Sequence, residues 1–162
     1  VLNRIDGGAM RYAPVYERFV DERDFESLVR NYFEQYLGQF PAQVFDKINE
    51  NFIRCSFFEL VSRYLSSCYT FAIEQNNSEG RADFEMTGIP GTDYYTDDRL
   101  VEFKYYKAKE AEKMLELDAP LPEHVEQVHR YAEDTLRHFP NYKVRTYVVY
   151  ICANRGWKCW ET

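Results

Sequence analysis

RLVEFKYYK, residues 99–107, is the stretch of sequence from which the fold can be worked out. Its apolar residues Val101 and Phe103 alternate with charged ones, and a period of two indicates a β-strand. Glu102 and Lys104 therefore share the other side of this strand. A half-buried strand can carry charge on its solvent face, and composition alone gives about one acid-x-Lys tripeptide in such a chain. The neighbours of the strand must decide whether the two charges form a solvated face or part of a site.

The composition is that of one folded domain. The chain has 162 residues, of which 17% are aromatic and 29% are charged, which suits one hydrophobic core and is unlike a disordered segment. It contains no run of about 18 apolar residues, so we expect no membrane-spanning helix. The N-terminus shows no basic segment followed by an apolar one, so we expect a cytoplasmic protein. Because the sequence begins with Val1, we expect it to be part of a longer protein.

Charge and cysteine spacing limit the class of function. A net charge of −7 argues against a protein that coats DNA by neutralising its phosphates. Lys104, Lys107, Lys109 and Lys113 nevertheless cluster, so a nucleic acid would bind more favourably near them. The four cysteines form no C-x-x-C pair and have no histidine at zinc spacing. We therefore expect no structural zinc, and reduced thiols that fill the core.

Periodicity and turn signals predict an α/β domain with a mixed sheet flanked by helices. Apolar residues at helical spacing mark the helices, and alternating or continuous apolar runs mark the strands. The second and third strands should form a hairpin with a long connection, and the fourth, apolar throughout, should be a central strand covered on both faces. The predicted helices span residues 25–37, 41–66, 107–117 and 123–139, and the predicted strands span residues 68–73, 81–89, 99–107 and 144–152, with an edge strand at 157–160.

A charged cluster follows if the two strands of the predicted hairpin pair with their apolar faces together. Asp83 lies between the apolar residues Ala82 and Phe84, so it shares the polar face of this hairpin. Glu102 and Lys104 lie on the same face. Two carboxylates and an ammonium group can there hold a divalent cation and a water beside it. The alternative is a solvated strand face with a cross-strand ion pair, which contributes little to stability.

Two sequence patterns resemble the PD-(D/E)xK nuclease superfamily. They are GRAD (80–83) and VEFK (101–104), within the order helix, three strands, helix, strand. The resemblance implies a restriction-endonuclease-like core that hydrolyses phosphodiester bonds of DNA. In that superfamily, residues that match Asp83 and Glu102 bind Mg²⁺, for which Mn²⁺ can substitute, and the residue that matches Lys104 orients or activates the attacking water.

A third pattern narrows the resemblance. QVHRY (127–131) is similar to the Q-x-x-x-Y element that RecB-like members carry on the helix after the catalytic strand. The similarity implies that Gln127 and Tyr131 position the substrate or brace the site, although both can also be ordinary helix residues. The histidines of this region show no ligand pattern, and we expect all three to be solvated: His124, His129 and His138.

The helix sequence INENFIRCSFFEL (48–60), together with the strand motifs, resembles a bacterial family in which a nuclease-like domain follows an AAA-type ATPase-like domain. That comparison implies that Glu50 completes the metal site, with Glu59 as its rival on the same helix. The comparison also implies that the chain is divided into two parts. Residues 1–40 would be a helical extension that connects to the ATPase-like part, and residues 41–162 would be the nuclease-like domain.

Two departures from the superfamily pattern have consequences. Ala82 stands where the superfamily has a proline before the first acid. The cysteine spacing does not match the iron–sulfur cluster of some RecB-like nucleases, so we predict none. For the nuclease we expect DNA contacts from Lys107, Lys109 and Arg130. The alternatives are a catalytically weak or inactive module of the same fold that binds nucleic acid or a partner, and a hydrolase for another phosphoester.

Overall fold

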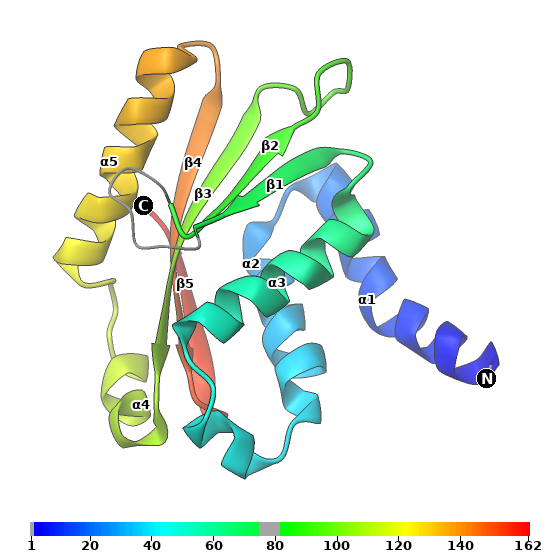
Figure 1. Cartoon of the computed structure of the whole chain (residues 1–162), viewed down its shortest axis with the longest axis vertical. Helices are drawn as coiled ribbons and strands as arrows, with labels where there is room; N and C mark the ends of the chain where they lie inside the picture. Colours follow the sequence, from blue (N-terminus) through cyan, green and yellow to red (C-terminus); the bar gives the residue numbers. More distant parts are fainter. Residues whose placement is uncertain (1, 75–81) are drawn as a thin grey trace.

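The computed structural model describes residues 2–74 and 82–162, and its centre is a five-stranded sheet with helices on both faces (Figure 1). The strands are β1 (Tyr69–Ile73), β2 (Phe84–Gly88), β3 (Asp97–Tyr106), β4 (Lys143–Cys152) and β5 (Gly156–Glu161). The α-helices are α1 (Leu2–Glu22), α2 (Phe25–Asn31), α3 (Glu50–Leu65), α4 (Ala108–Leu115) and α5 (Pro122–His138). A π-helical turn (Tyr32–Tyr36) and two 3₁₀ helices (Leu37–Gln39 and Ala42–Asp46) connect α2 to α3.

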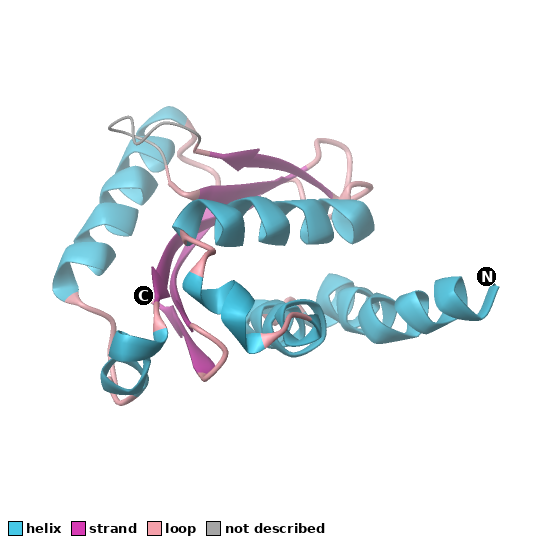
Figure 2. Ribbon diagram, turned by 60° about the horizontal axis from the view of Figure 1, so that its bottom comes forward, coloured by secondary structure: helices cyan, strands magenta, loops and turns pink. Residues whose placement is uncertain are grey.

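The strands lie in the order in which they occur in the chain, β1-β2-β3-β4-β5. Neighbouring strands are antiparallel except β3 and β4, which are parallel and are connected through α4 and α5. Figure 2 shows α3 along one side of the sheet and α5 on the other. The predicted mixed sheet, the long-connected hairpin β2–β3 and the edge strand β5 are therefore confirmed. So is the central position of β4, whose last seven residues are all buried.

One predicted helix is wrong. We expected a continuous helix over residues 41–66, but the chain forms a 3₁₀ helix at Ala42–Asp46 and starts α3 only at Glu50. The physical reason is Asn49, whose side-chain oxygen accepts a hydrogen bond from the backbone N–H of Phe52 at 2.9 Å and so caps the new helix. The break places Glu50 in the first turn of α3, where the helix dipole favours a carboxylate.

The main core lies between the sheet and the helices α1, α2 and α3. Phe57 of α3 is at its centre, with aromatic neighbours from four other segments: Phe25, Tyr32, Phe84 and Phe103. The N-terminal helices thus supply side chains to the same core as the sheet. The division of the chain at residue 40 stays a prediction.

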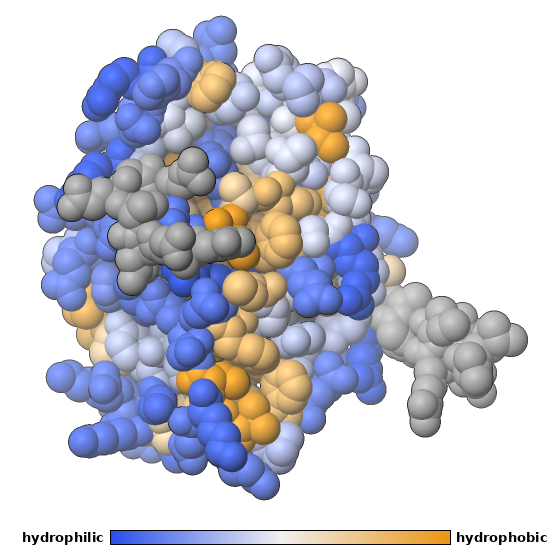
Figure 3. Space-filling view, viewed as in Figure 1, coloured by the Kyte–Doolittle hydropathy of each residue, from blue (hydrophilic) through white to orange (hydrophobic). Residues whose placement is uncertain are grey.

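A second, smaller core lies on the opposite face of the sheet, under α4 and α5. Val128 and Tyr131 of α5 pack there near Leu100 of β3 and Val148 of β4. The outward side of α5 is hydrophilic, whereas apolar residues form a band through the middle of the face drawn in Figure 3. Because both faces of the sheet are covered, charged side chains on β3 become buried on either side.

Two further expectations can be compared with the structure. No helix in residues 2–74 and 82–162 is both long and apolar enough to cross a bilayer. All four cysteines are free, but they are not all core residues, because Cys55 is exposed on α3. The expectation of four core thiols is therefore wrong for Cys55, which sits on the outer side of an amphipathic helix.

Candidate active site

The register of β2 and β3 places Asp83 next to Glu102. Phe84, the first residue of β2, is opposite Val101 in this antiparallel pair, so Asp83, just before β2, lies opposite Glu102 of β3. The backbone N–H of Phe103 donates a hydrogen bond of 2.9 Å to Asp83 Oδ2, which fixes the carboxylate against the strand. Two residues 19 apart in sequence are thus neighbours because of strand pairing alone.

Glu50 brings a third carboxylate to the same place from the N-terminus of α3. One oxygen each of Glu50, Asp83 and Glu102 lies within 4.8 Å of the others. Glu59, the rival on the same helix, is exposed and lies 3.5 Å from Arg63. The structure therefore groups Glu50, and not Glu59, with the two strand carboxylates.

Glu102 is one of the most buried charged residues, with 1% of its surface exposed. The expected alternative of a solvated strand face is wrong for this residue, because helices cover both faces of the sheet. Burial raises the pKa of Glu102 to about 8, and the charge of Asp83 and a hydrogen bond to Asp83 contribute to the rise. The charge of Lys104 acts in the opposite direction. Its Oε2 atom has no hydrogen-bond partner within the described residues.

Lys104 bridges two of the carboxylates. Its Nζ lies 3.4 Å from Glu102 Oε1 and 3.6 Å from Glu50 Oε1. Burial alone would lower the pKa of this lysine, but the nearby carboxylates, Glu50 first, outweigh burial and raise the pKa above its usual value. The ammonium group therefore stays protonated and acts as a fixed positive charge beside the carboxylates.

Arg54 is a residue of the site that the sequence did not reveal. It lies one helical turn after Glu50, is 6% exposed, and its Nη1 donates to Asp83 Oδ1 at 2.9 Å. Its Nη2 donates to Asn51 Oδ1 at 3.0 Å. An arginine on a helix usually points to solvent, so only its four-residue spacing from Glu50 could have suggested that it faces the site.

The α5 helix contributes residues on the side that faces the sheet. Gln127 Nε2 donates to Tyr131 Oη at 3.2 Å, so the two residues of the predicted Q-x-x-x-Y element contact each other. Tyr131 also lines a hollow of about 380 Å³ with Ala82 and Leu100. The role of the pair in substrate positioning stays a prediction.

Of the three histidines, two are exposed as expected: His129 and His138. For His124 the expectation of a solvated side chain is wrong, because only 12% of the side chain is exposed. Its Nδ1 lies 2.6 Å from Tyr150 Oη on β4. Burial lowers the pKa of His124, and the charge of Lys104 lowers it further.

The three residues expected to contact DNA lie in two different places. Lys107 and Lys109 are exposed immediately after β3, and Lys107 is three residues beyond Lys104. Arg130 lies on the outer side of α5, in an open hollow of about 630 Å³ that is also lined by Thr162 after the edge strand β5. The structure thus places the two lysines closer along the chain to the carboxylates, and Arg130 near the end of the edge strand β5.

The grouped side chains fit a divalent cation. Glu50, Asp83 and Glu102 offer carboxylate oxygens, which are the ligands that Mg²⁺ and Mn²⁺ prefer. The buried and unpaired Oε2 of Glu102 is also a position where a cation would replace a missing hydrogen bond. The nearby charges of Lys104 and Arg54 offset part of the repulsion among three carboxylates.

The sheet is mixed, and three carboxylates and a lysine lie together where β2 begins. This is the arrangement of a restriction-endonuclease-like nuclease domain. The chain belongs to the PD-(D/E)XK nuclease superfamily, whose family model matches residues 48–161. No curated protein matches the chain. The family match includes α3 and all five strands, and so every carboxylate of the site.

Proposed function

We propose that this chain is a divalent-metal-dependent nuclease that hydrolyses phosphodiester bonds of DNA. The observation that carries the proposal is the cluster of Glu50, Asp83 and Glu102, with one oxygen each within 4.8 Å and Lys104 Nζ between two of them. The family match supports nuclease chemistry in general. The finer parts of the proposal are the Mg²⁺ ion, with Mn²⁺ as a substitute, and DNA as the substrate.

In this proposal the three carboxylates would hold the cation. When bound, such a cation supplies Lewis acidity towards the phosphodiester and the attacking water. Lys104 donates hydrogen bonds from its ammonium group, so it orients that water and stabilises negative charge that develops on the phosphate. The raised pKa of Lys104 supports a role as a charged donor rather than as a base. Gln127 and Tyr131 brace the adjoining surface of α5 through their mutual hydrogen bond.

The proposal extends to the protein that would contain this chain. The Q-x-x-x-Y element supports a place in the RecB-like branch, and the helix and strand motifs support a larger protein with an ATPase-like domain. Four free cysteines support a reducing compartment such as the cytoplasm. Lys107 and Lys109, exposed after β3, and Arg130 on α5 would contact the phosphates of the DNA.

The test compares cleavage of labelled single-stranded and double-stranded DNA with Mg²⁺, with Mn²⁺ and with a chelator. We expect cleavage by the wild-type chain only with a divalent cation. Lys104→Met should lower the rate by at least about 100-fold, because removing one donor at a developing charge has an effect of that size. The matched control is Lys143→Met, which alters an exposed lysine at the start of β4 and should leave the rate unchanged. A wild-type chain that cuts neither DNA form with either metal would contradict the proposal.

One observation favours a second candidate, a module of the same fold that binds nucleic acid or a partner with little cleavage. Both carboxylate oxygens of Asp83 are already engaged, one by Arg54 and one by the backbone of Phe103. The net charge of −7 also opposes tight DNA binding. In that case DNA would bind with the same Kd with and without metal, and no product would form.

A further inference from the structure

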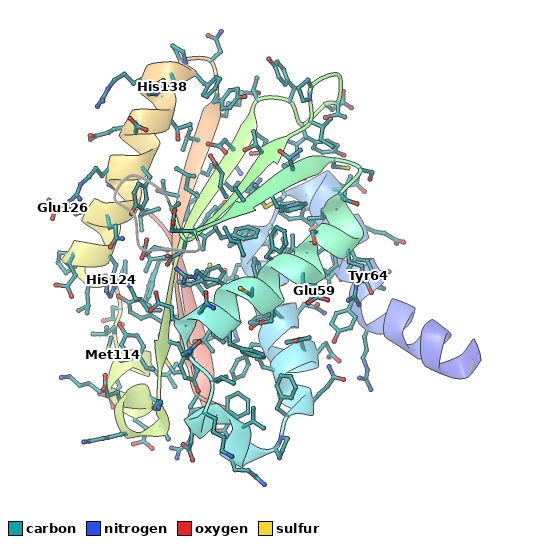
Figure 4. All side chains as sticks on the ribbon, in the orientation of Figure 1. Glu59, Tyr64, Met114, His124, Glu126 and His138 are labelled. Carbon is teal, nitrogen blue, oxygen red and sulfur yellow. The ribbon has the colours of Figure 1, made fainter. Side chains whose placement is uncertain are left out.

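His124 is held in a fixed orientation at the start of α5. Figure 4 labels it near the N-terminal end of that helix. Its Nδ1 lies 2.6 Å from Tyr150 Oη, and the same hydroxyl accepts a hydrogen bond of 2.9 Å from the backbone N–H of Leu121. Tyr150 is fully buried in β4, and its ring meets the imidazole ring edge to face at 5.5 Å. A strand in the middle of the sheet thus fixes a side chain on the helix above it.

These contacts determine which nitrogen of His124 carries the proton. A tyrosine hydroxyl has one proton to donate. Burial raises the pKa of Tyr150, so its hydroxyl group keeps that proton. Tyr150 Oη accepts from the backbone N–H of Leu121 and from the hydroxyl of Tyr106, so its own proton goes to His124 Nδ1. Burial lowers the pKa of His124, which favours the neutral ring. Nδ1 is then the acceptor, and Nε2 carries the N–H.

The Nε2–H group is left free to bind something else. The nearest charged partner is Glu123 Oε1, 4.0 Å away on a side chain that is 75% exposed, which is beyond hydrogen-bond distance. Within residues 2–74 and 82–162 no hydrogen bond to Nε2 is present. A half-buried donor without a protein partner, held in one orientation, is a feature of a binding site rather than of a packed core.

His124 lies on the side of α5 that faces the strands of the carboxylate cluster. Gln127 and Tyr131 follow it by three and seven residues, so the three side chains share one face of α5. Tyr150, which His124 contacts, is paired with Lys104 in the register of β3 and β4, so the imidazole lies over the strand pair that carries Lys104. The N-terminus of α5 adds the positive end of the helix dipole, which favours an anion.

We propose that His124 binds the DNA by donating its Nε2–H to a phosphate oxygen next to the cleaved bond, and that Tyr150 is the positioning residue that holds it there. The assignment rests on the proposed nuclease function and adds a substrate contact to it. His124 extends the face formed by Gln127 and Tyr131 by one turn, towards Lys104. It takes no part in holding the cation.

The test measures the Kd for a short fluorescein-labelled DNA, single-stranded and double-stranded, by fluorescence anisotropy with Ca²⁺ in place of Mg²⁺. His124→Ala should raise the Kd about tenfold, since a hydrogen bond to a charged group has that effect. Tyr150→Phe keeps the ring but removes the hydroxyl, so we expect a smaller rise of about threefold. His138→Ala is the matched control, because His138 is exposed in the last turn of the same helix, and the Kd of this variant should equal that of the wild type.

A second measurement on the wild type keeps the test valid if a variant fails to fold. In ¹⁵N NMR spectra the imidazole of His124 should show a protonated Nε2 and an accepting Nδ1, and its Nε2 signal should shift when DNA is added. Tyr150→Phe should shift the Nδ1 signal without DNA. Equal Kd values for wild type and His124→Ala, or an unshifted Nε2 signal in wild type saturated with DNA, would overturn this assignment alone. No DNA binding by the wild type would overturn both the assignment and the proposed function.

Discussion

Arg54 and Asp83 form a buried ion pair in which the arginine Nη1 lies 2.9 Å from the aspartate Oδ1. The pair joins α3 to the residue just before β2, so it connects the two elements that bring Glu50 and Asp83 to the same site. Arg54 also carries the positive charge that Asp83 needs in a place with little water. The carboxylate cluster can therefore be assembled before any cation binds.

Replacing Arg54 with methionine should destabilise the chain by about 3 kcal/mol in the presence of a chelator, because a buried carboxylate loses its partner. Methionine keeps most of the side-chain volume, so the effect reports charge rather than a cavity. The measurement is urea unfolding followed by circular dichroism. The double variant with Asp83→Asn should recover much of the loss, since no unpaired charge is then left.

Arg63→Met is the control for this prediction, because Arg63 lies on the same helix and, among the residues that the structure describes, forms an ion pair with exposed Glu59 alone. We expect it to change the free energy of unfolding by less than about 0.5 kcal/mol. A loss of equal size in the Arg54 and Arg63 variants would show that the buried pair makes no special contribution.

A divalent cation should stabilise the wild-type chain against heat. A ligand that binds only the folded state at a hundred times its Kd adds about 2.7 kcal/mol. Glu102→Gln should abolish this gain, since one of the three grouped carboxylates is lost. Differential scanning fluorimetry with Mn²⁺ and with a chelator measures both.

Glu59→Gln provides the comparison on α3, because its carboxylate is exposed and lies outside the group. It should keep the full rise in Tm with Mn²⁺. The assignment of Glu50 rather than Glu59 to the cluster fails if Glu59→Gln loses the rise and Glu50→Gln retains it.

Asp98 should make the stability of the chain depend on pH. It is fully buried on β3, and burial, followed by a hydrogen bond to Glu85 and the charge of Glu85, raises the pKa of Asp98 to about 8. Thr87 Oγ1 lies 3.0 Å from Asp98 Oδ1 and opposes this shift. The folded chain therefore holds a proton that the unfolded chain releases near the ordinary value of 3.8. The stability from this group is complete below that value and is lost as the pH rises towards about 8.

The free energy of unfolding should thus decrease from acidic to mildly alkaline pH, by up to about 1.4 kcal/mol per pH unit for this one group. Asp98→Asn imitates the protonated form, so it should weaken the decrease and be more stable than wild type near pH 9, roughly one unit above the pKa. Asp93→Asn removes the same charge from an exposed loop position and should leave the profile unchanged. A parallel profile for wild type and Asp98→Asn would refute this role of Asp98.

Much of the site could be predicted because strand geometry is regular. Alternation puts Glu102 and Lys104 on one side of β3, and antiparallel pairing then brings Asp83 to the same side. These steps need only a period of two and a hairpin. The roles of these residues as metal ligands and water-orienting groups stay predictions.

The parts that could not be predicted depend on contacts between distant segments. Glu102 is buried because α5 covers its face of the sheet. The alternation of side chains along β3 shows only that this face is polar. Arg54 and His124 face inward because of partners on other elements, Asp83 and Tyr150, which no local pattern indicates. The helix break before Glu50 depends on one capping side chain, Asn49, within a run that is apolar on several sides.

Phe25 provides a test of whether the N-terminal helices and the sheet fold together. Its ring stacks on Tyr147 of β4 at 4.3 Å and meets Phe57 of α3 at 6.0 Å, although it precedes the part of the chain that matches the family. Phe25→Ala should reduce the free energy of unfolding by about 3–5 kcal/mol, because a large side chain leaves a cavity in the main core. Unfolding followed by circular dichroism and by tyrosine fluorescence should remain a single transition.

The control is Phe139→Ala, since Phe139 is 51% exposed after α5 and stacks on Tyr142. Its loss should be about 1 kcal/mol or less. If Phe25→Ala instead produced two separate transitions, with the sheet unfolding at the wild-type urea concentration, residues 1–40 would be an independent extension. One transition shifted to lower urea would mean that the helices before residue 40 belong to the folding unit that builds the carboxylate cluster.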